Sequence, residues 1–252
     1  MSKISSSILI IGNEILSGRT QDINVQFIAK ELSKLGINLS EVRIVPDNKQ
    51  EIVFSLNQLR KKYDYVFTTG GIGPTHDDIT SECVCEAFNL DYSINSEAYD
   101  LLKSIYPEDE LNEGRIKMTK MPKGAKLIKN PLTVAPGFYI GNVYVLPGVP
   151  EIMQTMFLNI VKDLKFGDPI ISETVKTNLF ESIIAKSLEE IQKKFDDCEI
   201  GSYPSFDYKD KIGSSGGVNI VVSGKNLLSI KKAKVEIILA IRKMGGKTTL
   251  EE

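Results

Sequence analysis

The sequence predicts an α/β fold: a doubly wound, mostly parallel sheet in residues 1–167 and a second, smaller α+β module in residues 168–252. Two observations support this prediction. Continuous apolar runs within 5–13 and 63–69 are typical of strands that helices cover on both faces. Such runs alternate three times with segments whose apolar residues recur three and four apart, which is the pattern of repeated strand–helix–strand units.

The larger part is predicted to contain three strand–helix pairs, an irregular helical excursion, a hairpin and a last helix. Asp22 is a good N-cap, Gly36 a good helix end, and Pro150 suits a first helical turn. The Gly141-Asn142 pair is typical of a tight hairpin turn. In order, the elements are strand 5–13, helix 22–36, strand 38–45, a helix after Asp47 that ends near Tyr63, strand 63–69, a helix from Asp78 or Thr80 to Phe88, irregular helix 95–120, hairpin 138–146 and helix 150–160.

Beyond residue 165 the pattern changes and a smaller module begins. Its final residues, 245–252, are polar and are expected to be frayed. The predicted elements of this module are a strand near 170–177, a helix near 180–194, strands near 199–203 and 218–223, and a helix at 226–244.

Composition argues against several classes of protein. The chain has 31 basic and 33 acidic residues, so it lacks the overall positive charge of a nucleic-acid-binding protein. No window approaches the ~20 apolar residues of a membrane span, and the first residues do not resemble a secretion signal, so we expect a cytoplasmic protein. The three cysteines and the single histidine lack the spacing of a structural zinc site, and we expect Cys83 and Cys85 to be reduced core residues.

The stretch TTGGIGPTHDDIT, residues 68–80, is the strongest local signal in the sequence. A buried strand runs into Gly70, Gly71 and Gly73 just before a helix begins. Glycines let a ligand approach the backbone closely, and free amides at a helix N-terminus favour phosphate. The alternative is a glycine turn that only packs the helix on the strand. The polar cluster at 75–78 favours ligand binding, because it lies where the ligand crevice of such a sheet should be.

Two further groups of residues belong to the same end of the predicted sheet. Pro147, Gly148 and Pro150 are expected to shape the far wall of the crevice as rigid turn residues. Polar residues after the first strand are expected to contact a ligand or a metal, or else only to cap loops and helices: Asn13, Glu14, Ser17 and Asp22.

The stretch GSSGG, residues 213–217, matches the G-x-S-x-G spacing of a nucleophile elbow by its letters. A strand rather than a helix is predicted to follow it, and the single histidine precedes Ser215 instead of following it. We therefore reject a serine-hydrolase site at this position.

Several stretches together resemble the MoaB/Mog molybdopterin-binding family, in particular the amino-terminal domain of the competence/damage-inducible CinA proteins. They are TTGGIGPTHDDIT, GNEILSGRTQDINVQFIAKELSKLGI, VPDN, NPLTVAPGF and LPGVPEIMQTMF, and GSYPSF resembles the second half of the CinA amino-terminal region. Two positions depart from the pattern: Thr133 stands where the family usually has glycine, and Ile152 where it usually has glutamate, with Glu151 one place earlier. The chain is expected to lack the amidase activity of the domain that follows in full-length CinA proteins.

The resemblance implies roles for Asp47 and Asp78, which match acidic positions that Mog-type proteins use near a bound pyrophosphate and its metal. Each carboxylate follows the end of a predicted strand, so both can reach one crevice; the alternative for each is a helix N-cap. Carboxylate oxygens beside phosphate suit Mg²⁺, Mn²⁺ or Co²⁺. The predicted metal ligands are Asp47, Asp77 and Asp78, and the predicted catalytic residues are Asp47, Asp78 and His76.

Three functions fit these residues. The first, implied by the resemblance, is a metal-dependent pyrophosphatase that acts on an adenine dinucleotide such as ADP-ribose or FAD. The second is molybdopterin binding or adenylyl transfer in molybdenum-cofactor synthesis, and the third is a non-catalytic nucleotide-binding module. Each takes a small-molecule nucleotide or pterin, with neither nucleic acid nor a membrane as partner, and relatives imply a homo-oligomer. The predicted phosphate or ligand contacts are Gly12, Asn13, Glu14, Ser17, Thr69, Gly70, Gly71, Gly73, Pro74, Thr75, Pro147 and Gly148.

Overall fold

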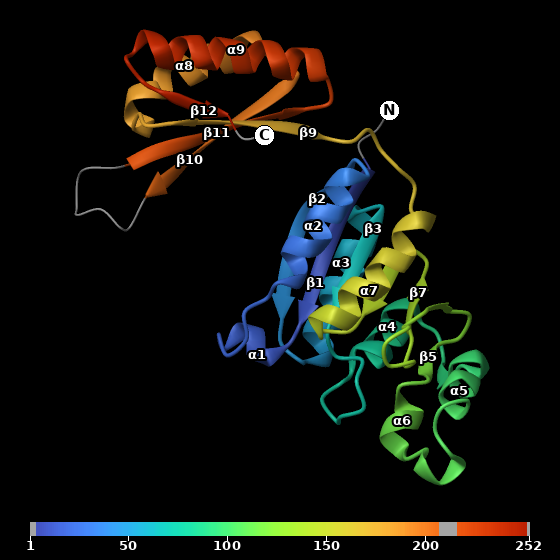
Figure 1. Ribbon diagram of the computed structural model, residues 1–252. Coiled ribbons are helices and arrows are strands. Elements are labelled where there is room, and N and C mark those ends of the chain that lie inside the picture. Colours follow the sequence, from blue (N-terminus) through green and yellow to red (C-terminus); the bar gives the residue numbers. More distant parts are fainter. Residues whose placement is uncertain (1–3, 207–215, 251–252) are drawn as a thin grey trace. The chain divides into compact units, whose positions relative to one another are not determined.

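The computed structural model describes residues 4–206 and 216–250 (Figure 1). By its contacts the chain divides into two compact units, 1–167 and 168–252. The larger unit holds the alternating strands and helices, and the smaller unit holds an antiparallel sheet with two helices.

The larger unit is built around a six-stranded sheet. Its strands are β1 (Ile4–Ile11), β2 (Ile37–Val45), β3 (Tyr65–Thr69), β6 (Lys126–Ile128), β7 (Gly137–Ile140) and β8 (Val143–Leu146). Their order in the sheet is β2-β1-β3-β8-β7-β6. β1 pairs in parallel with β2 and β3, and β3 pairs in parallel with β8, whereas β7 is antiparallel to both of its neighbours. The predicted mostly parallel sheet is confirmed.

Helices cover both faces of this sheet (Figure 1). They are α2 (Asn24–Lys34), α3 (Lys49–Lys62), α4 (Thr80–Phe88) and α7 (Pro150–Ile160). α3 and α4 pack with Leu9 and Ile11 of β1, and α2 and α7 pack with Ile8 and Ile10. Successive side chains of a strand point to opposite faces, so β1 is apolar at every one of these positions because both of its faces are covered.

The amphipathic pattern of α2 explains its position. Ile28 and Leu32 are fully buried and lie one helical turn apart. Burial of one such side chain stabilises the fold by about 1.5–3 kcal/mol. The predicted cap is present as well, because Asp22 Oδ1 accepts a hydrogen bond from the backbone N–H of Val25 at 2.9 Å.

Short elements complete the larger unit. They are α1 (Asn13–Leu16), β4 (Tyr92–Ile94), α5 (Ser96–Lys103), a 3₁₀ turn (Glu108–Glu110), α6 (Glu113–Lys117), β5 (Lys120–Pro122) and a second 3₁₀ turn (Val161–Asp163). β4 and β5 form a separate two-stranded antiparallel sheet. Asn95 caps α5 and Asn112 caps α6, each accepting a backbone N–H at 3.0 Å. The predicted irregular helical excursion therefore consists of two short capped helices.

The smaller unit is a four-stranded antiparallel sheet covered by two helices. Its elements are β9 (Ile171–Thr177), α8 (Glu181–Lys194), β10 (Cys198–Phe206), β11 (Gly216–Gly224), α9 (Leu227–Lys243) and β12 (Thr248–Leu250). Aliphatic side chains from both helices, such as Ile184 and Ile237, are buried against Val175 and Ile220 of the sheet. This unit therefore has its own apolar core, and the predicted α+β module is confirmed.

Two expectations needed correction. The first strand was predicted over 5–13, but β1 ends at Ile11, and Asn13–Leu16 forms one helical turn, which is too short to show a periodic pattern. The tail was expected to be frayed, but Thr248–Leu250 pairs with β9 as an antiparallel edge strand. Backbone pairing with β9 orders this segment, whose three residues are too few to show a strand pattern in the sequence. The hairpin prediction is confirmed, with Gly141 at a φ of 57°.

The cysteines are free and buried, as expected for core residues. Burial raises the pKa of the Cys83 thiol to about 12 and that of Cys85 to about 11, so both thiols are protonated near neutral pH. Among the residues that the structure describes, no helix is long and apolar enough to cross a membrane.

Candidate functional site

The first half of the glycine loop is packed tightly between β1 and α4. Gly70 has a φ of 101°, and a Cβ added there would lie 2.2 Å from the carbonyl oxygen of Ile11. A Cβ added at Gly71, whose φ is 70°, would lie 2.2 Å from Oγ1 of Thr80. That hydroxyl donates to the carbonyl of Gly70 at 3.0 Å. Both glycines are therefore required for packing, whether or not they also contact a ligand.

The second half of the loop is organised by Thr75. Its backbone N–H donates to Oδ2 of Asp78 at 2.8 Å, and its hydroxyl lies within hydrogen-bond distance of both Asp78 Oδ2 and Asp77 Oδ1, the latter at 2.7 Å. One hydroxyl hydrogen serves one carboxylate at a time. The hydrogen bond from Thr75 is the main reason why the pKa of Asp77 lies below its ordinary value. The loop therefore presents two neighbouring carboxylates held by one threonine.

A large hollow lies beside this second half of the loop. Pro74, Thr75, His76 and Asp78 line it from the loop, and Lys117 and Lys120 line it from α6 and β5. We call it the wide hollow. Its volume of about 580 Å³ is in the range of small-molecule sites. Lys117 Nζ donates to the carbonyl of Thr75, so α6 is tied to the loop by a direct hydrogen bond.

A second hollow lies at the carboxyl ends of β1, β3 and β8. Glu14, Asp22, Asn24, Thr69 and Gly148 are among the residues that line it, and we call it the narrow hollow. Its volume of about 60 Å³ is about a tenth of that of the wide hollow and is too small for a nucleotide. The two hollows share no lining residue.

Asn24 is the polar anchor of the narrow hollow. It is 4% exposed, and its Nδ2 donates to the carbonyl of Gly148 at 2.9 Å. Its Oδ1 is buried and has no hydrogen-bond partner among the described residues. This side chain therefore holds the turn after β8 against the start of α2 and leaves one acceptor pointing at no protein donor.

The ends of β1 and β2 are joined by capping interactions. Asp47 Oδ2 accepts the backbone N–H of Asn13 at 2.9 Å, at the start of α1. Asn48, one residue later, caps α3 by accepting the N–H of Gln50 at 3.0 Å. Ser17 donates from its hydroxyl to the carbonyl of Glu14 at 3.2 Å. The capping alternative thus describes the observed contacts of Asp47 and Asp22, and a ligand role for either stays a prediction.

The predicted site residues are therefore brought to one end of the sheet but are divided between two hollows. Glu14, Thr69 and Gly148 line the narrow hollow, and Pro74, Thr75, His76 and Asp78 line the wide one. Gly148 also contacts the glycine loop, since a Cβ added to it would lie 3.4 Å from the Cα of Gly70. The remaining predicted residues line neither hollow: Gly12, Asn13, Ser17, Asp47, Gly70, Gly71, Gly73, Asp77 and Pro147.

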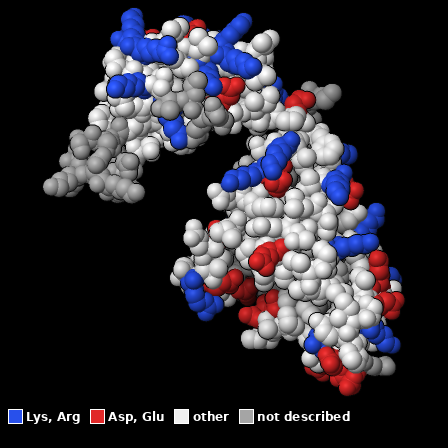
Figure 2. All heavy atoms as spheres, viewed as in Figure 1, with Lys and Arg blue, Asp and Glu red and all other residues white. Residues whose placement is uncertain are grey.

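The carboxylates do not form a ready-made ion cage. Within the described ranges, 4–206 and 216–250, there is no group of three or more His, Cys, Asp or Glu side chains that could hold a metal ion. Asp77 and Asp78 lie together on Thr75, whereas Asp47 is hydrogen-bonded at α1. On the face drawn in Figure 2, several acidic side chains gather near α1.

Several residues lining these hollows were missed at the sequence level, among them Asn24, Lys117 and Lys120. Lys117 and Lys120 lie about 40 residues beyond the glycine loop, in a segment without clear periodicity, so no local signal connected them to it. Asn24 could have been found, because a polar residue at the buried start of an amphipathic helix requires a partner.

The two departures from the family pattern have structural roles. Thr133 Oγ1 lies 2.6 Å from Nδ2 of the buried Asn130, which organises the loop before β7. Ile152 packs against the core on the α2 and α7 face, and Glu151 is exposed in the first turn of α7. The rejected GSSGG stretch lies largely outside the described residues, and β11 begins at its Gly216.

Comparison with known proteins places the chain in a family. Residues 7–166 match the model of a probable molybdopterin binding domain, and residues 169–245 match the model of the middle domain of FAD synthase. The chain belongs to the family of proteins with a molybdopterin-binding domain of the MoaB/Mog type, as the sequence motifs indicated. Within it, the chain is CinA-like and carries a second part similar to the FAD synthase middle domain.

Individual relatives agree with this assignment. The chain is 34% identical over 226 residues to a protein of Archaeoglobus fulgidus, covering 90% of this chain and 93% of that one. It is 31% identical over 256 residues to a protein of Saccharolobus islandicus, covering 96% of each chain. A solved structure of the protein CinA from Thermoplasma acidophilum, described as of unknown function, is 34% identical with a TM-score of 0.61, covering 64% of this chain and 99% of that one.

Proposed function

We propose that the chain binds the phosphates of an adenine nucleotide in the wide hollow and, with a divalent ion, cleaves the pyrophosphate of a dinucleotide such as FAD or ADP-ribose. The observation that carries this proposal is the wide hollow itself. It combines a volume of about 580 Å³ with Lys117 and Lys120 on one wall and the polar loop from Thr75 to Asp78 on the other.

Positive charge in this hollow comes from two sources. Each ammonium group has three N–H donors, and Lys117 uses one of them on the carbonyl of Thr75, which leaves two for a phosphate. The N-terminus of α4 adds a second source, because Ile79, its N-cap residue, lines the same hollow and unpaired helix amides attract anions. The carboxylates of Asp78, Glu82 and Glu113 line the same hollow, so a phosphate-bearing ligand fits it best together with a divalent cation.

The carboxylates suit an ion that arrives with its substrate. Mg²⁺ is usually bound by one or two carboxylates together with substrate phosphates, and Asp77 and Asp78 supply that number. Such an ion, when bound, would neutralise charge on the pyrophosphate. His76 lines the hollow and is exposed, so it could hold or release a proton at the leaving phosphate. A part for Asp47 would require the ligand to extend beyond the wide hollow, because Asp47 does not line it.

The relatives favour particular ligands. The match of residues 169–245 to the FAD synthase middle domain supports FAD as one substrate to test. The match of residues 7–166 to a probable molybdopterin binding domain supports the second candidate function, in which the same hollow binds a pterin or takes part in adenylyl transfer. The third candidate is nucleotide binding without turnover.

The test is to incubate the metal-stripped protein with FAD, ADP-ribose or NAD, each with Mg²⁺, Mn²⁺ or Co²⁺, and to measure AMP by chromatography. We expect AMP from the unmodified protein, loss of AMP in Asp78→Asn, and full activity in Asp100→Asn. Asp100 is the matched control because it is an exposed aspartate of α5 that lines neither hollow.

The other outcomes distinguish the candidates. The non-catalytic function would remain if the unmodified protein bound nucleotide but formed no AMP under any metal, and if Asp78→Asn bound nucleotide more weakly. No nucleotide binding, together with a fluorescent pterin that copurifies with the chain, would replace the nucleotide by a pterin. Equal turnover in Asp78→Asn and in the unmodified protein would contradict a site at the wide hollow.

A further inference from the structure

The outer face of α9 carries an exposed apolar stripe. Leu228 is 70% exposed, Val235 is 55% exposed and Leu239 is 58% exposed. On the opposite face of the helix, aliphatic side chains are buried against the sheet of the smaller unit: Ile230, Ala233, Ile237 and Ile241. The helix therefore has two apolar faces, and the described residues bury only the inner one.

The stripe has the spacing of a coiled-coil seam. Leu228, Val235 and Leu239 are seven and four residues apart, and Lys232 and Arg242 complete a series of alternating four- and three-residue steps. At about 100° per residue, the three apolar side chains lie within a sector of ~40°. A helix face that sinks into a core spans about 100° or more, whereas a coiled-coil seam is narrower. The stripe therefore suits a single partner helix.

Basic side chains flank the stripe on both sides. They are exposed, and in the part of the chain that the structure describes they form no ion pair with a carboxylate: Lys231, Lys232, Arg242 and Lys243. The one acidic residue of α9, Glu236, is paired with Lys194 of α8 at 2.8 Å. On the face drawn in Figure 2, Lys and Arg side chains gather over this helix. The outer face of α9 is therefore positively charged as well as apolar.

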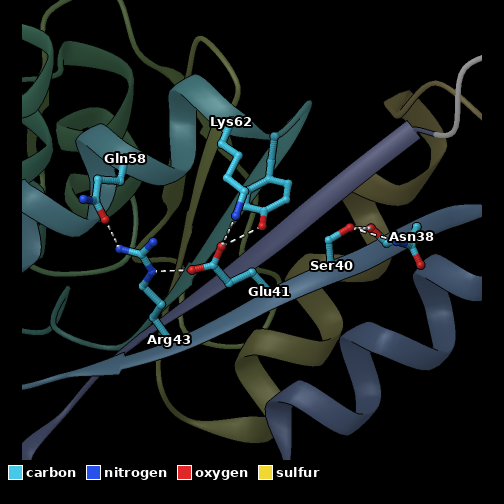
Figure 3. A network of polar contacts seen from close by, with 7 residues as sticks. Asn38, Ser40, Glu41, Arg43, Gln58 and Lys62 are labelled. Atoms are coloured by element: carbon cyan, nitrogen blue, oxygen red, sulfur yellow. Dashed lines mark hydrogen bonds and ion pairs between the residues drawn. The ribbon is translucent and has the colours of Figure 1, made fainter.

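The surface at β2 is different, because its charges are paired within the chain. Glu41 accepts hydrogen bonds from Arg43 Nε at 2.5 Å, Lys62 Nζ at 2.9 Å and the Tyr63 hydroxyl at 2.6 Å. Arg43 also donates to Gln58 (Figure 3). A carboxylate thus offsets the positive charge at β2, whereas the basic residues of α9 have no such carboxylate beside them. Their charge is available to an acidic partner.

We propose that the outer face of α9 binds an acidic amphipathic helix of another protein. Apolar side chains of that helix pack on the stripe, and its carboxylates lie beside the flanking basic residues. Lys232 and Arg242 lie in the seam itself, so acidic residues at the facing positions select the partner, as polar and charged seam residues do in coiled coils. A second α9 is excluded as the partner, because the basic side chains of both copies would meet at one seam.

Fluorescence anisotropy with a labelled synthetic helix tests the proposal on the full chain. The probe has about three heptads, with Leu at the seam and Glu at both flanks, and repulsion between its own Glu residues disfavours pairing with itself. We expect the unmodified chain to bind this probe. The same probe with Gln in place of Glu should bind at least about tenfold more weakly, because the charge pairs are lost while the protein is untouched.

Variants of the protein locate the binding surface. Reversing two charges together, Lys232→Glu with Arg242→Glu, should weaken binding at least about tenfold, and Leu239→Ser should weaken it about tenfold through lost apolar burial. The matched control is Lys30→Glu with Lys61→Glu, which makes the same change of charge at exposed lysines of α2 and α3. At physiological salt this control should leave the affinity unchanged, because charges far from the seam are screened.

Three outcomes would overturn the proposal. The first is no binding of the Glu probe, and the second is equal binding by the charge-reversed variant and the control. The third is binding of the chain to phosphatidylserine vesicles but not to the probe, with vesicle binding lost in Lys232→Glu with Arg242→Glu, which would assign the surface to a lipid. Thermal unfolding followed by circular dichroism establishes that each variant is folded.

Discussion

The two hollows at the ends of the glycine loop differ in size and in chemistry. The narrow hollow, of about 60 Å³, is lined by aliphatic side chains with Glu14, Asp22, Asn24 and Thr69 among them. The wide hollow, of about 580 Å³, is open to a ligand and carries lysines opposite carboxylates. Both lie beyond strand ends, where ligands of open α/β sheets bind. The difference shows that this end of the sheet combines a small, closely packed hollow with a separate cavity of ligand size.

Gly70 lies in the tightly packed first half of the glycine loop, and its substitution should have the largest effect. We expect Gly70→Ala to lower the free energy of unfolding by about 3–5 kcal/mol, because the Cβ combines a positive φ with overlap onto the backbone of Ile11. Gly18→Ala is the control, since Gly18 has a φ of 71° and open space around it, and it should cost only about 1–2 kcal/mol. Urea unfolding measures both; equal losses would show that φ alone matters.

Lys117 tests the wide hollow. We expect Lys117→Met to weaken binding of ADP-ribose about tenfold, the effect of losing one charge-assisted hydrogen bond. Lys123→Met, at an exposed lysine that lines neither hollow, should leave the affinity unchanged. Isothermal titration calorimetry gives both constants. Unchanged affinity in Lys117→Met would move the ligand out of the wide hollow.

Asn24 tests the narrow hollow. Asn24→Ala removes the hydrogen bond to the carbonyl of Gly148, so we expect the free energy of unfolding to fall by about 1 kcal/mol while ADP-ribose affinity stays the same. Gln26→Ala, at an exposed residue of the same helix α2 that lines neither hollow, is the control and should change neither quantity. Thermal unfolding and calorimetry are the measurements. A loss of affinity in Asn24→Ala alone would make the narrow hollow part of the ligand site.

Most of the fold could be predicted because its signals are local. The apolar run of β1, the cap at Asp22 and the Gly141-Asn142 turn are each predicted from a few neighbouring residues. The mostly parallel sheet followed from the repeated strand–helix units, whereas the order of its strands was not predicted from the sequence. The local sequence pattern failed to predict elements that depend on distant backbone partners. An example is β12, which is ordered by pairing with β9.

The sequence predicted which end of the sheet carries the candidate site, but not how the residues are arranged there. Strand ends located the glycine loop and Asp47 on the same edge, but a sequence does not reveal that Asp47 is hydrogen-bonded at α1 while Asp78 lines a cavity. Lys117 reaches Thr75 across 42 positions, through the caps and turns of the excursion. Contacts of this kind arise from tertiary packing, so spacing and periodicity could not have given them.

The smallest expected effect concerns the ionisation of Asp77 at the loop beside the wide hollow. The hydrogen bond from Thr75 lowers the pKa of Asp77, so the folded state favours the ionised carboxylate. This contribution is present above the ordinary pKa of aspartate and is lost as the pH falls through the lowered value. Thr75→Ala removes the hydroxyl, so the pKa should return toward its ordinary value and Mg²⁺-dependent nucleotide binding should fail at a higher pH. Carbon NMR of the Asp77 carboxyl group reports the pKa directly.

The control is Thr133→Ala, which removes a threonine hydroxyl from the loop before β7 and should leave the Asp77 titration unchanged. The hydrogen bond from Thr75 lowers the pKa of Asp77, so Thr75→Ala should raise that pKa and Thr133→Ala should not. An ionised Asp77, which shares Thr75 with the hollow-lining Asp78, can help to hold a cation beside a phosphate down to a lower pH than an aspartate with its ordinary pKa. The narrow hollow is lined by the carboxylates of Glu14 and Asp22 with no lysine among its lining residues. If Thr75→Ala left both the carboxyl pKa and the pH profile of binding unchanged, the threonine would be a packing residue, and the chemical difference between the hollows would rest on Lys117 and Lys120.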